Sequence, residues 1–299
     1  MTGNMPAAEV DVDVDLVRRL LTSQHPDLAD VPIELVTNGW DNVMFRLGDD
    51  LAVRVPRRAS AVPLIEAEQQ WLARFAPSLP VPVPAPVRSG VAGDGYPWPW
   101  SVVPWFEGRP FAPDPPDDLD RTARQLGEFV AALQRPLDGL PLNPFRGRPL
   151  VDLDASVRSR LPQISSTTDV DVDRLVVAWE AALAAPVWDG PSMLLHGDLH
   201  PLNVVVDDDG LVAVIDFGDL TGGDPATDYL AAWLFFDAPQ RELFVDALGA
   251  GDAALDDATW ERGRGAAISW CTAVVANTAD HPVLHRIGLD GLARLLGDR

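Results

Sequence analysis

The chain has 299 residues, of which 47% are hydrophobic and 23% charged, and its formal net charge is −22. This hydrophobic content is ordinary for a folded globular protein, and no apolar run of about 18 residues predicts a membrane span. The acidic excess excludes a nucleic-acid-binding surface, which needs a basic face, and is compatible with either a cationic ligand or general solubility. All 23 basic residues are arginine, which excludes a phosphate-binding loop built on lysine.

The ends of the chain and its cysteine content indicate a compartment. The first 15 residues carry neither a basic start nor a long apolar run, so no secretory signal is expected. The single cysteine, Cys271, cannot form an intrachain disulfide and lies in an apolar stretch typical of a core. We therefore expect a cytoplasmic protein that neither enters a membrane nor binds nucleic acid.

The first third of the chain predicts mostly strands. Asn-Gly and Gly-Asp turns separate three apolar runs, which is typical of hairpins. Several prolines between residues 77 and 86 then exclude helix and favour an extended path, before another apolar run at 98–106. In chain order we expect a helix at 13–24, strands at 33–37, 43–47 and 51–55, and a helix at 63–75.

After residue 108 the pattern changes to helical periodicity. The expected helices lie at 119–134, 174–185, 227–236 and 241–248. Segments 136–150 and 162–170 are rich in Pro, Gly, Ser and Thr, and predict loops. The change predicts two lobes, which we place at 1–104 and 105–299. The fold class is then α+β, with a small β-rich N-terminal lobe carrying one main helix and a larger, mostly helical C-terminal lobe.

The most informative segment lies around residue 200. A polar loop containing Asp198 leads to Asn203, and two apolar runs joined by an acidic turn then end at Asp216. Antiparallel pairing of the two runs would bring Asn203 and Asp216 to one end of a hairpin, where amide and carboxylate oxygens can share Mg²⁺. Asp198 would lie beside that metal and could accept or orient a hydroxyl proton. The segment therefore predicts phosphoryl transfer.

The spacing His196-x-Asp198-x-x-x-x-Asn203, followed by Ile-Asp-Phe-Gly at 215–218, resembles the catalytic and metal-binding segments of aminoglycoside phosphotransferases. The resemblance implies the bilobal protein-kinase-like fold of that family. It also implies a catalytic role for Asp198, and that Asn203 and Asp216 are ligands of Mg²⁺ on the phosphates of ATP or GTP. His196 would then support the catalytic loop.

Two further positions follow from the same resemblance. His200 stands where protein kinases have a lysine near the transferred phosphate, so we predict a catalytic contact for it, with simple packing as the alternative. The later segment 223–228 resembles the start of the family's next helix. There Asp224 or Thr227 would cap the helix, and Asp228 would tie it to the catalytic loop.

The first lobe also resembles the nucleotide-binding part of this superfamily. The turn that ends at Asn42 lies where a loop covering the phosphates is expected. Arg54 holds the third-strand position that is usually lysine, and it keeps a positive charge and a fork of donors. Glu68 is the carboxylate expected to pair with Arg54, and Glu66 is the alternative.

The run 100–108 resembles the linker that receives the adenine base. Its backbone would carry the recognition, through the carbonyl of Pro104 and the amide of Phe106, with Val103 beside the inner pocket. Proline has no amide to donate, which makes Phe106 the natural donor.

The expected partners are a nucleoside triphosphate and a hydroxylated small molecule that can be cationic. An aminoglycoside suits the many aspartates, whereas a macrolide suits the ten tryptophans. Metabolic acceptors such as sugars or choline-like alcohols remain open, because a fold does not fix a substrate. Besides Asp198, candidate acceptor contacts are Asp228, Trp233, Glu261 and Trp270.

Two hypotheses of other classes accompany the kinase. One is a non-catalytic nucleotide-binding protein with the same fold. The other is a metal-dependent hydrolase built on His196, Asp198 and His200, which would bind a transition metal and need no nucleotide.

Overall fold

The computed structural model describes residues 7–249 and 255–297, which form two compact units. None of the helices in these two ranges has the length and apolar character needed to cross a bilayer. Unit 1 consists of Met1–Ser78, Pro82–Glu107 and Ile215–Gly218, and unit 2 of Leu79–Val81, Gly108–Val214 and Asp219–Arg299.

Unit 1 is built on a five-stranded antiparallel sheet with the strand order β1-β2-β3-β5-β4. The sharp turn from β2 to β3 is possible because Gly48 adopts a φ of 61°, which other residues rarely take. The three hairpin strands predicted from the sequence are confirmed. The strands are β1 Ile33–Asn38, β2 Asn42–Leu47, β3 Leu51–Pro56, β4 Arg88–Gly90 and β5 Trp100–Pro104.

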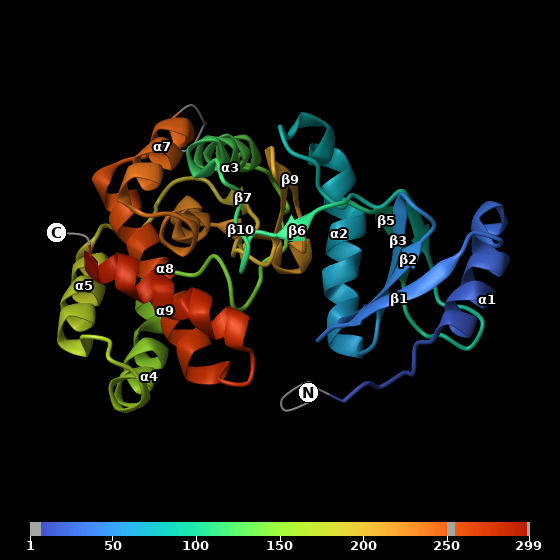
Figure 1. The fold of residues 1–299 in the computed structure, drawn as a ribbon, viewed down its shortest axis with the longest axis horizontal. Helices are drawn as coiled ribbons and strands as arrows, with labels where there is room; N and C mark the ends of the chain where they lie inside the picture. The colour runs from blue at the N-terminus through green and yellow to red at the C-terminus, as the bar shows by residue number, and fades with distance from the viewer. Residues whose placement is uncertain (1–6, 250–254, 298–299) are drawn as a thin grey trace. The chain divides into compact units, whose positions relative to one another are not determined.

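Helices cover both faces of this sheet (Figure 1). Successive side chains of a strand point to opposite faces, so Phe45 and Val53 pack with Leu20 of α1 (Val14–Gln24), whose N-cap is Asp13. Arg54, next to Val53, points to the other face and reaches α2 (Val62–Phe75). The sheet therefore has an apolar core with α1 on one face, whereas the face toward α2 also holds the buried Arg54–Glu68 pair.

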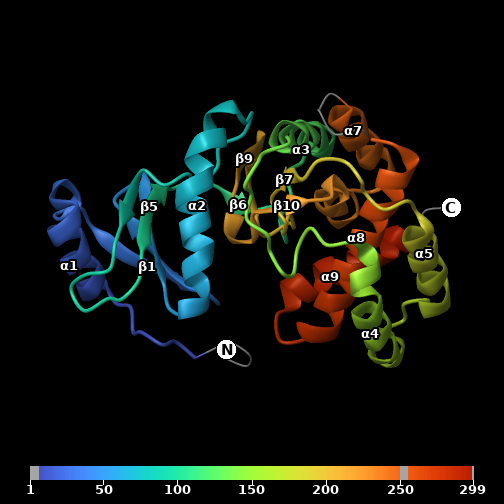
Figure 2. The same ribbon diagram turned by 180° about the vertical axis from the view of Figure 1, so that it is seen from behind.

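Unit 2 is mainly helical, and α8 lies at its centre, packed against α4, α5 and α9 (Figure 2). Close packing is possible because Gly265 has no side chain, and a Cβ there would lie 2.8 Å from Ala182 of α5. The helices are α3 Leu119–Leu133, α4 Asp154–Thr167, α5 Val172–Ala184, α6 Ala231–Phe235, α7 Ala238–Leu248, α8 Asp257–Asn277 and α9 Pro282–Gly297.

The strands of unit 2 form two small sheets. One has the order β6-β8-β9, and in the other β7 pairs with β10. In the first, Val204 pairs with Val214, which confirms the predicted hairpin and places Asn203 just before one strand and Ile215 just after the other. The strands are β6 Arg109–Pro110, β7 Met193–Leu195, β8 Val204–Asp207, β9 Gly210–Val214 and β10 Thr221–Gly223.

Two predictions about local structure were wrong. Residues 162–167, expected in a loop, complete α4 despite Pro162 inside the helix. Burial of Val157 and Ile164 stabilises that helix, and the hydroxyl of Thr167 satisfies the carbonyl of Gln163 near its end.

The second error concerns 227–236, expected as a single helix. It is a 3₁₀ helix, η6 (Pro225–Leu230), that continues into the short helix α6. The N–H of Ala231 bonds to the carbonyl of Asp228 three residues earlier, which defines the tighter turn.

One of the boundaries between the units falls at Glu107–Gly108. Local contacts explain why 105–107 belong to unit 1. Trp105 donates its backbone N–H to the carbonyl of Asp50. The guanidinium of Arg46 lies 4.3 Å from the Trp105 ring centroid and pairs with Glu107.

Candidate functional site

The loop after β7 is held by a buried carboxylate. Asp228 in η6 is fully buried, and it accepts hydrogen bonds from the backbone N–H of His196 at 2.8 Å and of Gly197 at 2.9 Å. Burial raises the pKa of Asp228, although His196 and the two N–H groups oppose the rise. Gly197 has a φ of 84°, and a Cβ there would lie 2.3 Å from the carbonyl oxygen of Asp219. The predicted tie between Asp228 and the loop is confirmed.

Asp198 lies at the surface of this loop with its two carboxylate oxygens in different surroundings. Oδ1 accepts from the indole Nε1 of Trp270 at 3.0 Å and lies 3.0 Å from Nη2 of Arg146. Oδ2 lies 3.5 Å from Nε2 of His200. Burial acts to raise the pKa of Asp198, but His200, Arg146 and Trp270 outweigh it and hold the pKa well below its usual range. Asp198 is therefore an ionised carboxylate with a fixed orientation.

The other polar side chains of the loop bond mainly to its own backbone. Nδ2 of Asn203 donates to the backbone carbonyl of Asp198 at 3.0 Å and lies 3.2 Å from Nε2 of His200. His200 accepts the N–H of Leu202 at Nδ1, and its ring lies 5.4 Å from that of Trp270. Because its nitrogen is engaged, the amide of Asn203 turns its oxygen away from these partners.

Arg146 is a residue of this site that the sequence analysis missed. Its Nε and Nη2 each lie 2.9 Å from Oδ2 of Asp219, and the same Nη2 reaches Asp198. Burial acts to lower the pKa of Arg146, but Asp198 and Asp219 raise it overall. The sequence signal that could have drawn attention to this part of the site is the position of Asp219, directly after the Ile-Asp-Phe-Gly motif. Arg146 itself lies in a Pro- and Gly-rich loop and gave no such signal.

The candidate acceptor contacts prove to have different roles. Trp270 bonds Asp198, whereas Asp228 supports the loop from its buried side. Trp233 is 1% exposed and stacks on Trp260 at 4.4 Å, which makes it a core residue. Glu261 is half-buried in α8.

Unit 1 gathers a second set of predicted residues around Arg54. Its Nη1 lies 2.6 Å from Glu68 and its Nη2 3.0 Å from Asp216. With its amide oxygen facing the guanidinium, Asn42 accepts from Nε and Nη2 at 3.1 Å each. The expected Arg54–Glu68 pair is thus present, and Glu66 lies on the exposed side of α2. Burial raises the pKa of Glu68 to about 7, against the opposing effect of Arg54.

The linker residues lie at the end of β5. Val103 is 4% exposed, and Pro104 pairs with Leu51 at the last position of the strand. The next N–H, that of Trp105, donates to the carbonyl of Asp50, the residue just before β3. Because a trans peptide is planar, the carbonyl of Pro104 must point the opposite way, away from β3. The amide of Phe106 follows one residue later.

A sequence profile of the phosphotransferase enzyme family matches residues 32–266, which is most of the chain. The chain belongs to the phosphotransferase enzyme family. The resemblance recognised in the sequence and the prediction of a phosphotransferase are thereby confirmed. No curated protein sequence matches the chain.

Solved structures of phosphotransferases share the fold. Aminoglycoside 2'-phosphotransferase-IIIa with GDP is 21% identical, with a TM-score of 0.68 over 94% of this chain and 98% of that one. Macrolide 2'-phosphotransferase MphH from Brachybacterium faecium is 23% identical, with a TM-score of 0.63 over 94% and 97%. The gentamicin complex of APH(2")-IIa is 18% identical, with a TM-score of 0.60 over 97% and 98%. The predicted α+β, kinase-like fold is confirmed.

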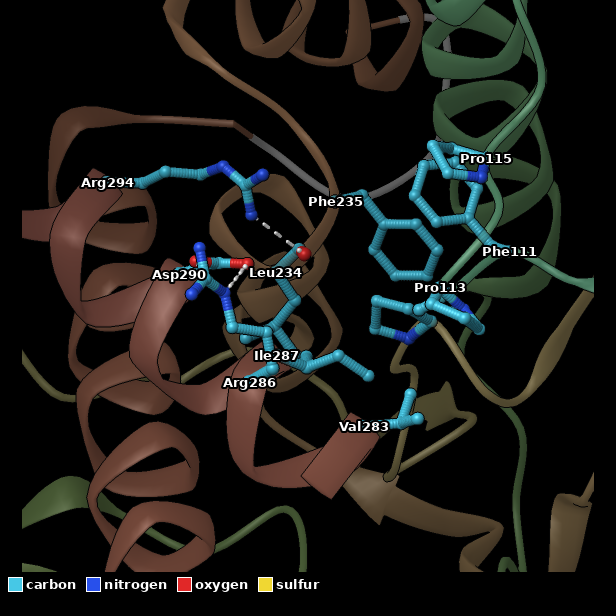
Figure 3. Close-up of a pocket in the computed structure, with 12 residues that line it drawn as sticks. Phe111, Pro113, Pro115, Leu234, Phe235, Val283, Arg286, Ile287, Asp290 and Arg294 are labelled. Atoms are coloured by element: carbon cyan, nitrogen blue, oxygen red, sulfur yellow. Dashed lines mark hydrogen bonds and ion pairs between the residues drawn. The ribbon is translucent and has the colours of Figure 1, made fainter. Parts of the chain in front are cut away.

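Unit 2 of this phosphotransferase also contains a pocket of about 220 Å³ that includes Pro201 of the loop between β7 and β8. Figure 3 shows Phe111 and Phe235 on one side of it and Ile287 of α9 on the other. A hydrogen bond joins two residues that line this pocket: the N–H of Ala112 donates to the carbonyl of Pro201 in the loop at 3.4 Å. Apart from Arg286, Asp290 and Arg294, the lining is apolar.

The hydrolase hypothesis is not supported by the described part of the chain. No group of three or more His, Cys, Asp or Glu side chains there is arranged to hold a metal. Nδ1 of His196 accepts the N–H of Asp198, and Nδ1 of His200 accepts that of Leu202. The ring nitrogens of both histidines are therefore partly committed to the loop's own backbone.

Replacing Asp228 by asparagine should loosen the catalytic loop. The amide would direct a donor at one of the two backbone N–H groups, and leaving a buried donor unsatisfied costs about 1–3 kcal/mol. We expect a lower urea midpoint and reduced phosphotransfer. Asp208→Asn is the control, since Asp208 is 97% exposed in its salt bridge with Arg109. Equal midpoints for the two variants would contradict the supporting role of Asp228.

Glu68 should make unit 1 less stable as the pH rises. Its folded pKa of about 7 exceeds the ordinary value of 4.5, so the folded state retains a proton that the unfolded chain loses. This contribution is complete below about pH 4.5 and is lost as the pH passes 7; it amounts to at most about 3 kcal/mol. Urea unfolding from pH 4.5 to 8 should show this slope in the wild type and in Glu66→Gln, but not in Glu68→Gln. An unchanged slope in Glu68→Gln would refute the assignment.

Proposed function

We propose that this protein is a small-molecule kinase that transfers the γ-phosphate of ATP or GTP to a hydroxyl of an antibiotic. An aminoglycoside is the first candidate acceptor, and a macrolide or a metabolic alcohol is the alternative. The observation that carries the proposal is the ionised, oriented Asp198 on a loop held by buried Asp228. Asn203 and Asp216 follow Asp198 at the spacing that phosphoryl transfer of the kinase type uses.

The nucleotide is assigned to unit 1. Arg54 is held by Glu68, Asp216 and Asn42, so its guanidinium has a fixed orientation and needs no reorganisation to meet a phosphate. The carbonyl of Pro104 points away from β3 and can accept from a base amine. GDP and ADP are bound in solved structures of the same fold, which supports a nucleoside triphosphate as the phosphate donor.

Mg²⁺ fits the donor set of the predicted metal residues. The ion prefers oxygen ligands and usually needs only one or two from the protein when phosphates supply others. Asn203 presents its amide oxygen because its nitrogen is engaged, and the carboxylate of Asp216 is 55% exposed. When bound, the ion would neutralise charge on the phosphates.

Asp198 is assigned to the acceptor hydroxyl. Oδ1 already accepts from Trp270 and Arg146, so Oδ2 is the atom assigned to receive the hydroxyl hydrogen. A carboxylate with so low a pKa is a weak base. We infer that it mainly orients the hydroxyl and receives the proton late, which a loose phosphoryl transition state permits. His200, at 3.5 Å from Oδ2, is proposed to contribute to this orientation.

The acceptor class rests on charge and on the relatives. The net charge of −22 would attract a cationic molecule. Structures of the same fold hold kanamycin, gentamicin or streptomycin, and others are macrolide 2'-phosphotransferases. A non-catalytic nucleotide-binding protein is the competing hypothesis, and the complete set of Asp198, Asn203 and Asp216 favours the enzyme.

A screen with nucleotides should separate these hypotheses. We expect ATP or GTP with Mg²⁺ to raise the unfolding temperature by several degrees, as ligand at about 100 times its Kd adds about 2.7 kcal/mol. Zn²⁺ or Mn²⁺ alone should have little effect, whereas a hydrolase would show the reverse. Phosphate transfer over a panel of aminoglycosides, macrolides and amino alcohols then identifies the acceptor.

Asp198→Asn should remove most phosphoryl transfer, by about 100-fold or more, because the amide cannot take up the hydroxyl proton. Nucleotide binding, measured by calorimetry, should stay close to that of the wild type. Asp208→Asn is again the matched control and should keep its turnover. Near-normal transfer by Asp198→Asn would overturn the catalytic assignment.

A further inference from the structure

Arg146 lies between two carboxylates that a cationic acceptor would otherwise meet. Its guanidinium contacts Oδ1 of Asp198 at 3.0 Å and Oδ2 of Asp219 at 2.9 Å. Within unit 2, the side chain proposed to receive the hydroxyl is therefore already paired with a positive charge. The net charge of the whole chain is negative, but at this position Arg146 neutralises part of the negative charge.

The segment that carries Arg146, which we call the strap (residues 141–147), is anchored independently of that side chain. The carbonyl of Pro141 accepts from the backbone N–H of Gly222 and from the hydroxyl of Thr221, each at 3.0 Å. The backbone N–H of Asn143 donates to the same hydroxyl, and its Nδ2 donates to Oδ1 of Asp219 at 2.8 Å. These bonds hold the strap against β10.

The end of the strap packs too closely to shift easily. A Cβ on Gly223 would lie only 2.6 Å from the carbonyl oxygen of Gly147, the residue after Arg146. The guanidinium also contacts both carboxylates. An acceptor ammonium that displaced it would pair with Asp198 alone and would leave Asp219 without its charged partner. We therefore treat Arg146 as a fixed part of the site.

We propose that Arg146 determines acceptor specificity, and that the reacting hydroxyl must come from an acceptor whose adjacent substituent is uncharged. The inference rests on the proposed kinase function. The hydroxyl assigned to Oδ2 bonds the same carboxylate whose Oδ1 contacts the guanidinium at 3.0 Å, so a substituent next to that hydroxyl can approach Arg146. An ammonium there meets a like charge, whereas a hydroxyl or an apolar carbon does not. On an aminoglycoside, the reacting hydroxyl would then be one flanked by hydroxyls rather than by amines.

The surroundings of Arg146 agree with an uncharged neighbour. Phe145 and Leu142 of the strap are 76% and 84% exposed, so the segment that carries Arg146 offers apolar surface. The indole of Trp270 contacts Asp198 from α8. These groups suit the carbon skeleton of an acceptor ring rather than a second cation.

A matched pair of small acceptors tests the proposal directly. We would incubate trans-1,2-cyclohexanediol and trans-2-aminocyclohexanol with the full-length protein and Mg·ATP or Mg·GTP. Phosphate transfer to each compound and to water would be measured by ³¹P NMR. The compounds differ only in the group beside the reacting hydroxyl. We expect the wild type to prefer the diol by about tenfold, the effect of one nearby like charge.

Three variants assign the preference to the guanidinium. Arg146→Gln should lose the preference or reverse it, and Arg146→Lys should keep part of it. Arg148→Gln should behave as the wild type, since Arg148 pairs with Asp152 and does not contact Asp198 or Asp219. Its bond to the carbonyl of Pro144 is lost in the variant, but the bonds of Pro141 and Asn143 still hold the strap to β10. Circular dichroism and the urea midpoint check the fold of each variant. A general packing defect would lower both rates together and leave their ratio unchanged.

The outcomes are distinct. If the wild type treats both compounds alike, including by phosphorylating neither while it transfers phosphate to water, the specificity proposal is wrong. The same follows if Arg146→Gln and Arg148→Gln retain equal preferences. If the wild type neither binds Mg·nucleotide nor turns it over, the proposed kinase function fails, and the specificity inference falls with it.

Discussion

A single buried carboxylate, that of Asp228, fixes the backbone on which the proposed chemistry depends. Its two oxygens accept the N–H groups of His196 and Gly197, so the loop leaves β7 in one conformation. The positive φ of Gly197 and its close approach to Asp219 make that conformation specific to glycine. Asp198 then emerges at a defined position. The fully buried carboxylate of Asp228 thus supports the position of Asp198, which we propose contacts the substrate.

Arginine supplies the positively charged side chains in both units, because the chain contains no lysine. Unit 1 places Arg54 between Glu68 and Asp216, and unit 2 places Arg146 between Asp198 and Asp219. Buried ion pairs contribute little net stability, since desolvation offsets their attraction. Their value is orientation: a planar guanidinium held by two acids presents its remaining edge in one direction. We propose that this shared arrangement serves phosphate binding in unit 1 and selection of the acceptor in unit 2.

Much of the fold could be predicted because its signals are local. The turn at Gly48 and the spacing of apolar residues specify the first hairpins, and Asp13 marks the start of α1. Other segments could not be predicted, because long-range packing decides them. The helix α4 contains Pro162 and ends in polar residues, and burial of Val157 and Ile164 in unit 2 outweighs that weak local preference.

The sequence alone determined the phosphotransferase family and the residues of its motifs, because the loop, the hairpin and the residues proposed to bind metal lie within about 20 residues at fixed spacing. The resemblance also favoured Glu68 over Glu66 as the partner of Arg54, and the fold decided between them by burying Glu68 against the guanidinium and leaving Glu66 exposed. Only the tertiary structure decided the charge around Asp198. Arg146 is 52 positions away in the sequence, and no periodicity or spacing connects the two. Contacts between the strap, β10 and the catalytic loop bring them together, which is why composition alone suggested an acidic site that the fold has partly neutralised.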